Sequence, residues 1–91
     1  MLTEIVLAAN MTVASHCSSV AEFAGHTMQA RQEGVPVYQI ARVLDEGDAS
    51  PLLHAIVEEA YRTPRLSPHR QPAAVLDYQD EIYLICVEAL R

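Results

Sequence analysis

The sequence contains no lysine and no tryptophan, and only four Tyr and one Phe supply its aromatic side chains. Its six cations are all Arg, against twelve Asp and Glu, so the formal net charge is −6. Proteins that grip nucleic-acid phosphates need clustered cations, and so do polybasic membrane anchors. Binding of single strands by stacking needs more aromatic side chains than this chain has. The composition therefore argues against direct binding of nucleic acid and against binding to a membrane surface.

Glycine is scarce as well, with three residues, and no segment alternates apolar and polar residues for the length of a strand. A hairpin-rich fold is therefore not expected. Hydrophobic residues make up 51% of the 91 positions, which is enough for one small domain with its own core. Apolar residues recur instead at spacings of three, four and seven, which is typical of helices. We predict an all-α fold, a single small domain (residues 1–91) of four or five helices packed around one core.

The first helix is expected over residues 3–33, because one face of this segment is apolar. The residues of this face are Val6, Val13, Cys17, Val20, Ala24 and Met28. Ser19 and Glu22 match a capping box, so two alternatives stand: one long helix, or a separate N-terminal helix that includes residues 1–16. Residues 5–9 would be apolar on all sides of a helix, and a second copy of the chain would cover them, which predicts a homodimer.

Glycine and proline mark the later boundaries. Gly34 and Pro36 end the first helix, Ser50-Pro51 begins the third, and Thr63-Pro64 ends it. The last helix is expected to begin at Pro68 with a defect at Pro72, or near residue 72 without one. The predicted apolar faces of these three helices are Val37, Ile40, Val43 and Leu44; then Leu52, Leu53, Ile56, Val57, Ala60 and Tyr61; and finally Val75, Leu76, Ile82, Ile85, Cys86, Ala89 and Leu90.

Acidic residues gather in the middle of the chain, where no Arg lies between positions 43 and 61. The cluster comprises Asp45, Glu46, Asp48, Glu58 and Glu59. Such a face would steer the encounter with a basic partner protein, or it would simply solvate a loop and a helix flank. The nearby cations Arg62, Arg65, His69 and Arg70 are expected to pair with these acids.

The two cysteines, Cys17 and Cys86, lie near opposite ends of the chain. A disulfide between them would close a loop of about 70 residues and stabilise the fold by roughly 4 kcal/mol. The alternative is a pair of buried free thiols in a cytosolic protein. Pairs this far apart do not form a metal-binding motif.

The N-terminal segment bears on the compartment. Residues 5–9 form an apolar run far too short for a membrane span, Glu4 stands where a signal peptide carries Lys or Arg, and Asn10 interrupts the run. We therefore predict a cytoplasmic protein. The location becomes periplasmic if the weak cleavage pattern at residues 13–15 is used.

Residue types that carry chemistry occur only in unsuitable arrangements. His16-Cys17 and Glu58-Glu59 are adjacent in sequence, and adjacent side chains on a helix point about 100° apart. No His or Cys pair has the two- to five-residue spacing of most zinc sites, and there is no glycine-rich phosphate loop or nucleophile elbow. The sequence predicts no enzyme, no metal site and no cofactor.

Three stretches occur in a distinctive order: A-R-Q-E-G-V-P at residues 30–36, A-Y-R-T-P-R at 60–65 and D-Y-Q-D-E-I-Y-L-I-C at 77–86. Together they resemble a group of short, uncharacterised helical proteins of proteobacteria and their phages, which show A-R-Q-x-G-V-P, A-Y-x-x-P-R and Y-L-x-C. The resemblance spans roughly residues 17–88. It implies a phage or mobile-element origin and no catalytic residues, and many members of the group carry a signal peptide ahead of the first cysteine.

Two hypotheses about function follow. In the first, the chain is a small acidic phage protein that binds and inhibits a host protein complex with a basic surface, as an anti-CRISPR does with a nucleic-acid-binding effector; this is an analogy of class. In the second, it is an exported periplasmic helical protein, stapled by a Cys17–Cys86 disulfide, that binds a partner or a small ligand. Free thiols would favour the first hypothesis and a disulfide the second.

Overall fold

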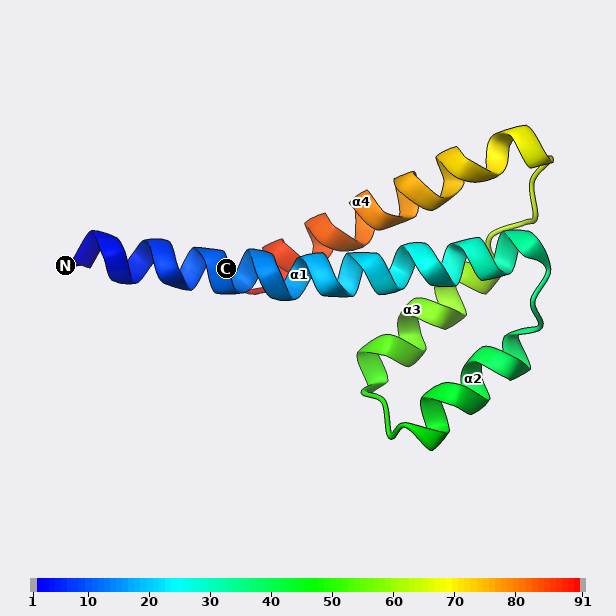
Figure 1. Cartoon of the computed structure of the whole chain (residues 1–91), viewed down its shortest axis with the longest axis horizontal. Helices are drawn as coiled ribbons and strands as arrows, with labels where there is room; N and C mark the ends of the chain where they lie inside the picture. The colour runs from blue at the N-terminus through cyan, green and yellow to red at the C-terminus, as the bar shows by residue number, and fades with distance from the viewer. Residues whose placement is uncertain (1, 91) are drawn as a thin grey trace.

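Four α-helices make up most of the chain in the computed structural model, which describes the backbone of residues 2–90 and the side chains of residues 13–90 (Figure 1). They are α1 (Leu2–Glu33), α2 (Val37–Glu46), α3 (Pro51–Arg62) and α4 (Gln71–Leu90). One turn of 3-10 helix, η1 (Pro68–Arg70), precedes α4, and no strand occurs between residues 2 and 90. The predicted all-α fold is confirmed.

The backbone from Leu2 to Glu33 is a single helix. Ser19 does not begin a new helix, because its hydroxyl donates to the carbonyl of Ser15 one turn earlier, at 3.3 Å. The capping-box alternative at this position is therefore wrong. The apolar segment at residues 5–9, on which the predicted homodimer depends, lies outside the residues whose side chains are described.

The end of α1 has a local backbone cause. Gly34 has φ +87°, a left-handed conformation that glycine adopts without strain. The N–H of Gly34 donates to the carbonyl of Arg31 at 3.1 Å, and the N–H of Val35 donates to that of Ala30 at 2.9 Å. This pairing is a Schellman motif, so the predicted helix end at Gly34 is correct.

Proline explains the other helix starts. Pro36 immediately precedes α2, and Pro51 is the first residue of α3 after Ser50. Pro68 opens η1, while Pro72 is the second residue of α4, where its missing N–H would have had no helical partner. Of the two alternatives for the last helix, the clean start near residue 72 is therefore correct: η1 precedes it, and α4 begins at Gln71.

The helices are arranged around the second half of α1. α4 runs antiparallel along one side of α1, α3 packs on another side, and α2 packs mainly on α3 (Figure 1). The Cα atoms span 50 × 32 × 14 Å, so the body is flat. A body this thin encloses few side chains completely.

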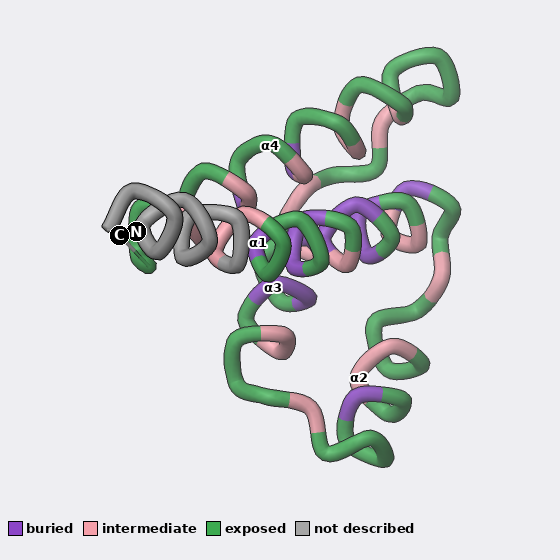
Figure 2. The backbone as a smooth tube through the Cα atoms, turned by 60° about the vertical axis from the view of Figure 1, so that its left-hand side comes forward, coloured by how far each residue is buried: buried purple, intermediate pink, exposed green. Residues whose placement is uncertain are grey.

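The core forms where α1, α3 and α4 meet. It comprises Val20, Ala24 and Met28 of α1, Ile56 and Ala60 of α3, and Tyr78 and Ile82 of α4. The buried positions follow one side of α1 and recur on α3, as the purple segments of Figure 2 show. The predicted face of α1 is therefore correct for its described members from Cys17 to Met28.

The predicted faces of the later helices are buried only in part. On α2 only Leu44 is buried, whereas Val37 and Val43 are exposed, and on α3 Leu52 is exposed. The exposed large apolar residues of α4 are Leu76, Leu84, Ile85 and Leu90. The physical reason is geometric: α4 is apolar around most of its circumference, and its main neighbour, α1, covers only one side.

Candidate functional site

The five acidic residues predicted as a partner-binding face lie on three separate pieces of backbone. Asp45 and Glu46 are in the last turn of α2, Asp48 is in the turn that follows, and Glu58 and Glu59 are on α3. All five are exposed. Asp48 has φ +53°, a conformation that Asp adopts more readily than most residues, so its place in this turn has a backbone explanation.

Two of these acids have partners within the protein. Arg42 donates to Glu46 at 3.1 Å, and His54 Nε2 lies 3.5 Å from a carboxylate oxygen of Asp45. Both pairs are local. The first joins two residues one turn apart on α2, and the second joins α2 to α3. The expected pairing with Arg62, Arg65, His69 and Arg70 is not among the ion pairs of the described side chains, and Arg65 instead donates to the carbonyl of Gln32.

Glu59 faces a different neighbour from Glu58. It lies near Tyr78, whose hydroxyl donates to the carbonyl of Ile56 at 2.6 Å. Burial raises the pKa of Tyr78 to about 12, and the carboxylates of Glu59 and Glu81 add to the rise. Because consecutive side chains on a helix diverge by about 100°, Glu58 and Glu59 do not point at the same surface.

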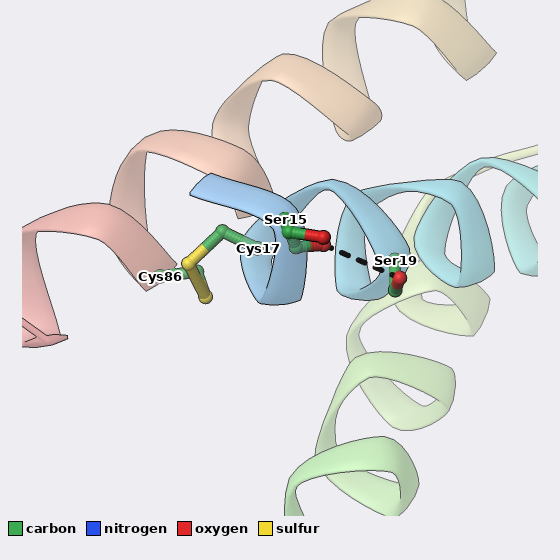
Figure 3. The surroundings of a disulfide bond; sticks show 4 residues. All are labelled: Ser15, Cys17, Ser19 and Cys86. Atoms are coloured by element: carbon green, nitrogen blue, oxygen red, sulfur yellow. Dashed lines mark hydrogen bonds between the residues drawn. A yellow bond between two sulfur atoms is a disulfide. The ribbon is translucent and has the colours of Figure 1, made fainter. Parts of the chain in front are cut away.

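The two cysteines meet as a disulfide that joins α1 to the last turns of α4 (Figure 3). Their Cα atoms are 5.6 Å apart, although the residues are 69 positions apart in the sequence. Cys17 is completely buried. The disulfide therefore connects the two longest helices, and it does so near the C-terminal end of α4.

Two of the three stretches that carry the resemblance meet at the other end of α1, around Gln32. The side chain of Gln32 is only 1% exposed, and both ends of its amide are used. Its nitrogen donates to the carbonyl of Pro64 at 3.0 Å, and its oxygen accepts the N–H of Leu66 at 2.7 Å. The backbone carbonyl of Gln32 also accepts a hydrogen bond from Arg65 at 3.2 Å. We call this set of contacts the Gln32 junction.

Arg31 and Tyr61 reinforce the Gln32 junction. Arg31 donates to the carbonyl of Thr63 at 2.9 Å, and its guanidinium lies 5.5 Å from the centre of the Tyr61 ring, within range of a cation–π contact. The Tyr61 hydroxyl donates to the carbonyl of Val35 at 2.7 Å. Burial raises the pKa of this hydroxyl, and the charge of Arg31 lowers it in part. The residues of both stretches thus hold the end of α1 against the linker after α3, and these contacts stabilise the fold.

Two separate hollows that the sequence did not predict lie between α1 and α4, one of about 440 Å³ and one of about 220 Å³. We call the two together the α1–α4 groove. The first is lined by Gln29, Gln32, Glu33, Pro68, Gln71, Pro72, Val75 and Leu76, and the second by Ser18, Ala21, Glu22, Gln79, Asp80 and Tyr83.

Gln79 and Gly25 face each other between the two hollows. A Cβ atom at Gly25 would overlap the side chain of Gln79, so the absence of a side chain on α1 lets Gln79 lie directly against the helix backbone. The sequence did contain a signal for the groove: Pro72, Leu76 and Tyr83 recur at helical spacing on α4, beside the face that is buried. The predicted apolar face of α4 includes Leu76 as a buried residue, whereas the structure leaves it 61% exposed beside the first hollow.

Metal-type ligands do not gather anywhere in the part of the chain that the structure describes: no group of three or more His, Cys, Asp or Glu is placed to hold a metal ion. Within the same range, no helix is long and apolar enough to cross a membrane. Comparisons with family models, with curated proteins and with solved structures each find no match to the chain.

Proposed function

We propose that this protein is a non-enzymatic binding module that folds and works in an oxidising compartment such as the bacterial periplasm. The observation that carries the proposal is the disulfide between Cys17 and Cys86. Disulfides persist in exported proteins and are rare in the cytosol, where thiols are kept reduced. A flat domain of 91 residues with a small core is also the kind of protein that gains most from a covalent staple.

A binding role is supported by large apolar side chains of α4 that remain exposed to solvent. Leu76, Leu84 and Ile85 of α4 are each more than half exposed, and Leu76 also borders a hollow. An exposed apolar residue beside a hollow, such as Leu76, is the kind of surface at which proteins bind partners. The module would act through contact with a partner.

The second candidate is a cytoplasmic inhibitor, of phage origin, that blocks a basic host complex through its acidic face. The observation in its favour is that Asp48, Glu58 and Glu59 are exposed and take part in neither of the two ion pairs among the described side chains. In that case, reversing Glu58 and Glu59 together to Arg abolishes partner binding and leaves the fold intact.

Thiol trapping in living cells separates the two candidates. The full chain, with a small affinity tag, is expressed in its native host, and the cells are quenched in acid and treated with a maleimide before and after reduction. We expect no label before reduction, two labels after it by mass spectrometry, and recovery of the protein in the periplasmic fraction. The Cys17→Ala/Cys86→Ala variant gives the blank. Two labels before reduction, with the protein in the cytoplasmic fraction, contradict the proposal and favour the inhibitor.

A further inference from the structure

We infer that the α1–α4 groove is the surface through which this module binds, and that its occupant is an amphipathic helix of a partner protein with an apolar face flanked by Lys or Arg. The inference rests on the proposed binding role and is independent of the compartment. Its basis is the shape of the groove, the hydrogen bonds of its polar side chains and the sign of its charges.

The groove has the dimensions of a helix-binding surface. Its lining residues on α1 extend from Ser18 to Glu33, which is about 22 Å at 1.5 Å per residue, or roughly four turns of an occupying helix. The two hollows lie about seven residues apart along α4 and about eleven apart along α1, a separation of about 10–16 Å at 1.5 Å per residue. A helix lying along both would place side chains two to three turns apart, at positions i and i+7 or i+11, into the two hollows.

Most polar side chains of the first hollow already have partners within the protein. Gln29 donates to Glu33 at 3.1 Å, and Gln71 donates to the carbonyl of Leu66 at 2.9 Å. Gln32 uses its whole amide in the Gln32 junction. In the first hollow Pro72, Val75 and Leu76 offer apolar contact, which suits the apolar face of a helix. The second hollow is mostly polar, with Glu22 and Asp80 in its lining, and it suits the basic flank of the same helix.

The charged side chains that line the two hollows have one sign, although His69 and Arg70 stand in the chain between the lining residues Pro68 and Gln71. The charged side chains in the lining are Glu22, Glu33 and Asp80, all carboxylates. α4 as a whole carries Asp77, Asp80, Glu81 and Glu88, and it has no Arg. A second copy of the chain seated face to face would bring six lining carboxylates together, and a phosphate-bearing partner would be repelled in the same way. Lys or Arg flanking the apolar face of an incoming helix would instead be attracted.

A synthetic probe tests both parts of the inference. The probe is a fluorescein-labelled peptide of about 18 residues, with Leu on one helical face and Lys on the other, titrated with the oxidised full chain while anisotropy is followed. We expect saturable 1:1 binding that weakens roughly tenfold from low to physiological salt. A peptide with Glu in place of Lys, and one of the same composition with its Leu residues dispersed, should both fail to bind. Equal binding of the dispersed peptide would overturn the inference, because it would show attraction by charge alone.

Two substitutions on α4 locate the contact. Leu76 and Leu84 are on the same helix and are similarly exposed, at 61% and 58%, but only Leu76 lines a hollow. We expect Leu76→Asn to weaken peptide binding about tenfold and Leu84→Asn less than twofold. Because both side chains are exposed, both variants should fold, which circular dichroism checks. Equal losses, or a larger loss for Leu84→Asn, would overturn the assignment of the groove.

A second pair of variants locates the charge. Glu22→Gln/Asp80→Asn removes two lining carboxylates, and Glu58→Gln/Glu59→Gln removes two from the predicted acidic face while leaving the same net charge. We expect the first variant to weaken binding and to flatten its salt dependence, and the second to do neither. The opposite result would move the site to α3. If the protein is periplasmic and disulfide-bonded but does not bind the peptide, only the assignment of the α1–α4 groove is overturned. If the protein has free thiols and binds the peptide, only the proposed compartment is overturned.

Discussion

Replacing Gln32 by Leu removes the centre of the Gln32 junction with little change in volume. Leu can neither donate to the carbonyl of Pro64 nor accept the N–H of Leu66, which now contact the Gln32 amide at 3.0 and 2.7 Å. A fully buried backbone group left without a partner costs about 1–3 kcal/mol; because both contacts are only part-buried and Pro64 is exposed, the two together should lower the free energy of unfolding by about 1–3 kcal/mol. A chain of this length has roughly 5–14 kcal/mol in total, so the loss is a large fraction.

Urea denaturation followed by circular dichroism measures this loss in the oxidised protein. Gln29→Leu is the matched control, because Gln29 is on the same helix but exposed, and it bonds only to Glu33. We expect the control to change the free energy of unfolding by less than about 0.5 kcal/mol. If Gln32→Leu were as stable as Gln29→Leu, the linker after α3 would not depend on the Gln32 amide, and the structural explanation of the A-R-Q stretch would be refuted.

Three further predictions concern the backbone, the pH dependence and the disulfide. Gly34→Ala should destabilise the fold by about 1–2 kcal/mol, because Gly34 has φ +87° and a Cβ there would lie 3.1 Å from the Arg65 guanidinium. Gly47 has φ −86°, so Gly47→Ala should destabilise the fold less. Equal thermal midpoints for the two variants would contradict this prediction. The folded-state pKa of Tyr78, about 12 against an ordinary 10.0, means that its neutral form contributes stability that is complete below pH 10 and is lost as the pH rises through 12. Tyr78→Phe should make urea midpoints measured from pH 9 to 12 fall less steeply, and an unchanged slope would count against it. The Cys17–Cys86 disulfide joins residues 69 positions apart, so its reduction should lower the free energy of unfolding by about 4 kcal/mol. The same reducing agent should not change the stability of a Cys17→Ala/Cys86→Ala variant. Coincident urea denaturation curves for the oxidised and reduced protein would show that the bond contributes nothing.

Helix boundaries could be predicted because their causes are local. Gly34, Ser50-Pro51 and Thr63-Pro64 act through the conformational limits of one or two residues, and the structure places helix ends at each of them. The one local signal that misled is Ser19, whose hydroxyl bonds within α1 instead of capping a new helix. A Ser in mid-helix can bond to the carbonyl four residues earlier as well as cap a new helix, and Ser19 does the former.

The sequence by itself determined the all-α class, most helix ends and the buried face of α1, because glycine, proline and helical spacing act over a few residues. Only the tertiary structure decided which side of α4 is buried, since that helix is apolar around most of its circumference and the position of α1 chooses among its faces. The same holds for Gln32: a glutamine is ordinarily a surface residue, and it is buried here because the linker after α3 passes within hydrogen-bond distance of both ends of its amide. The α1–α4 groove is of the same kind, because its two walls lie some 50 residues apart along the chain and become neighbours only when α4 folds back along α1.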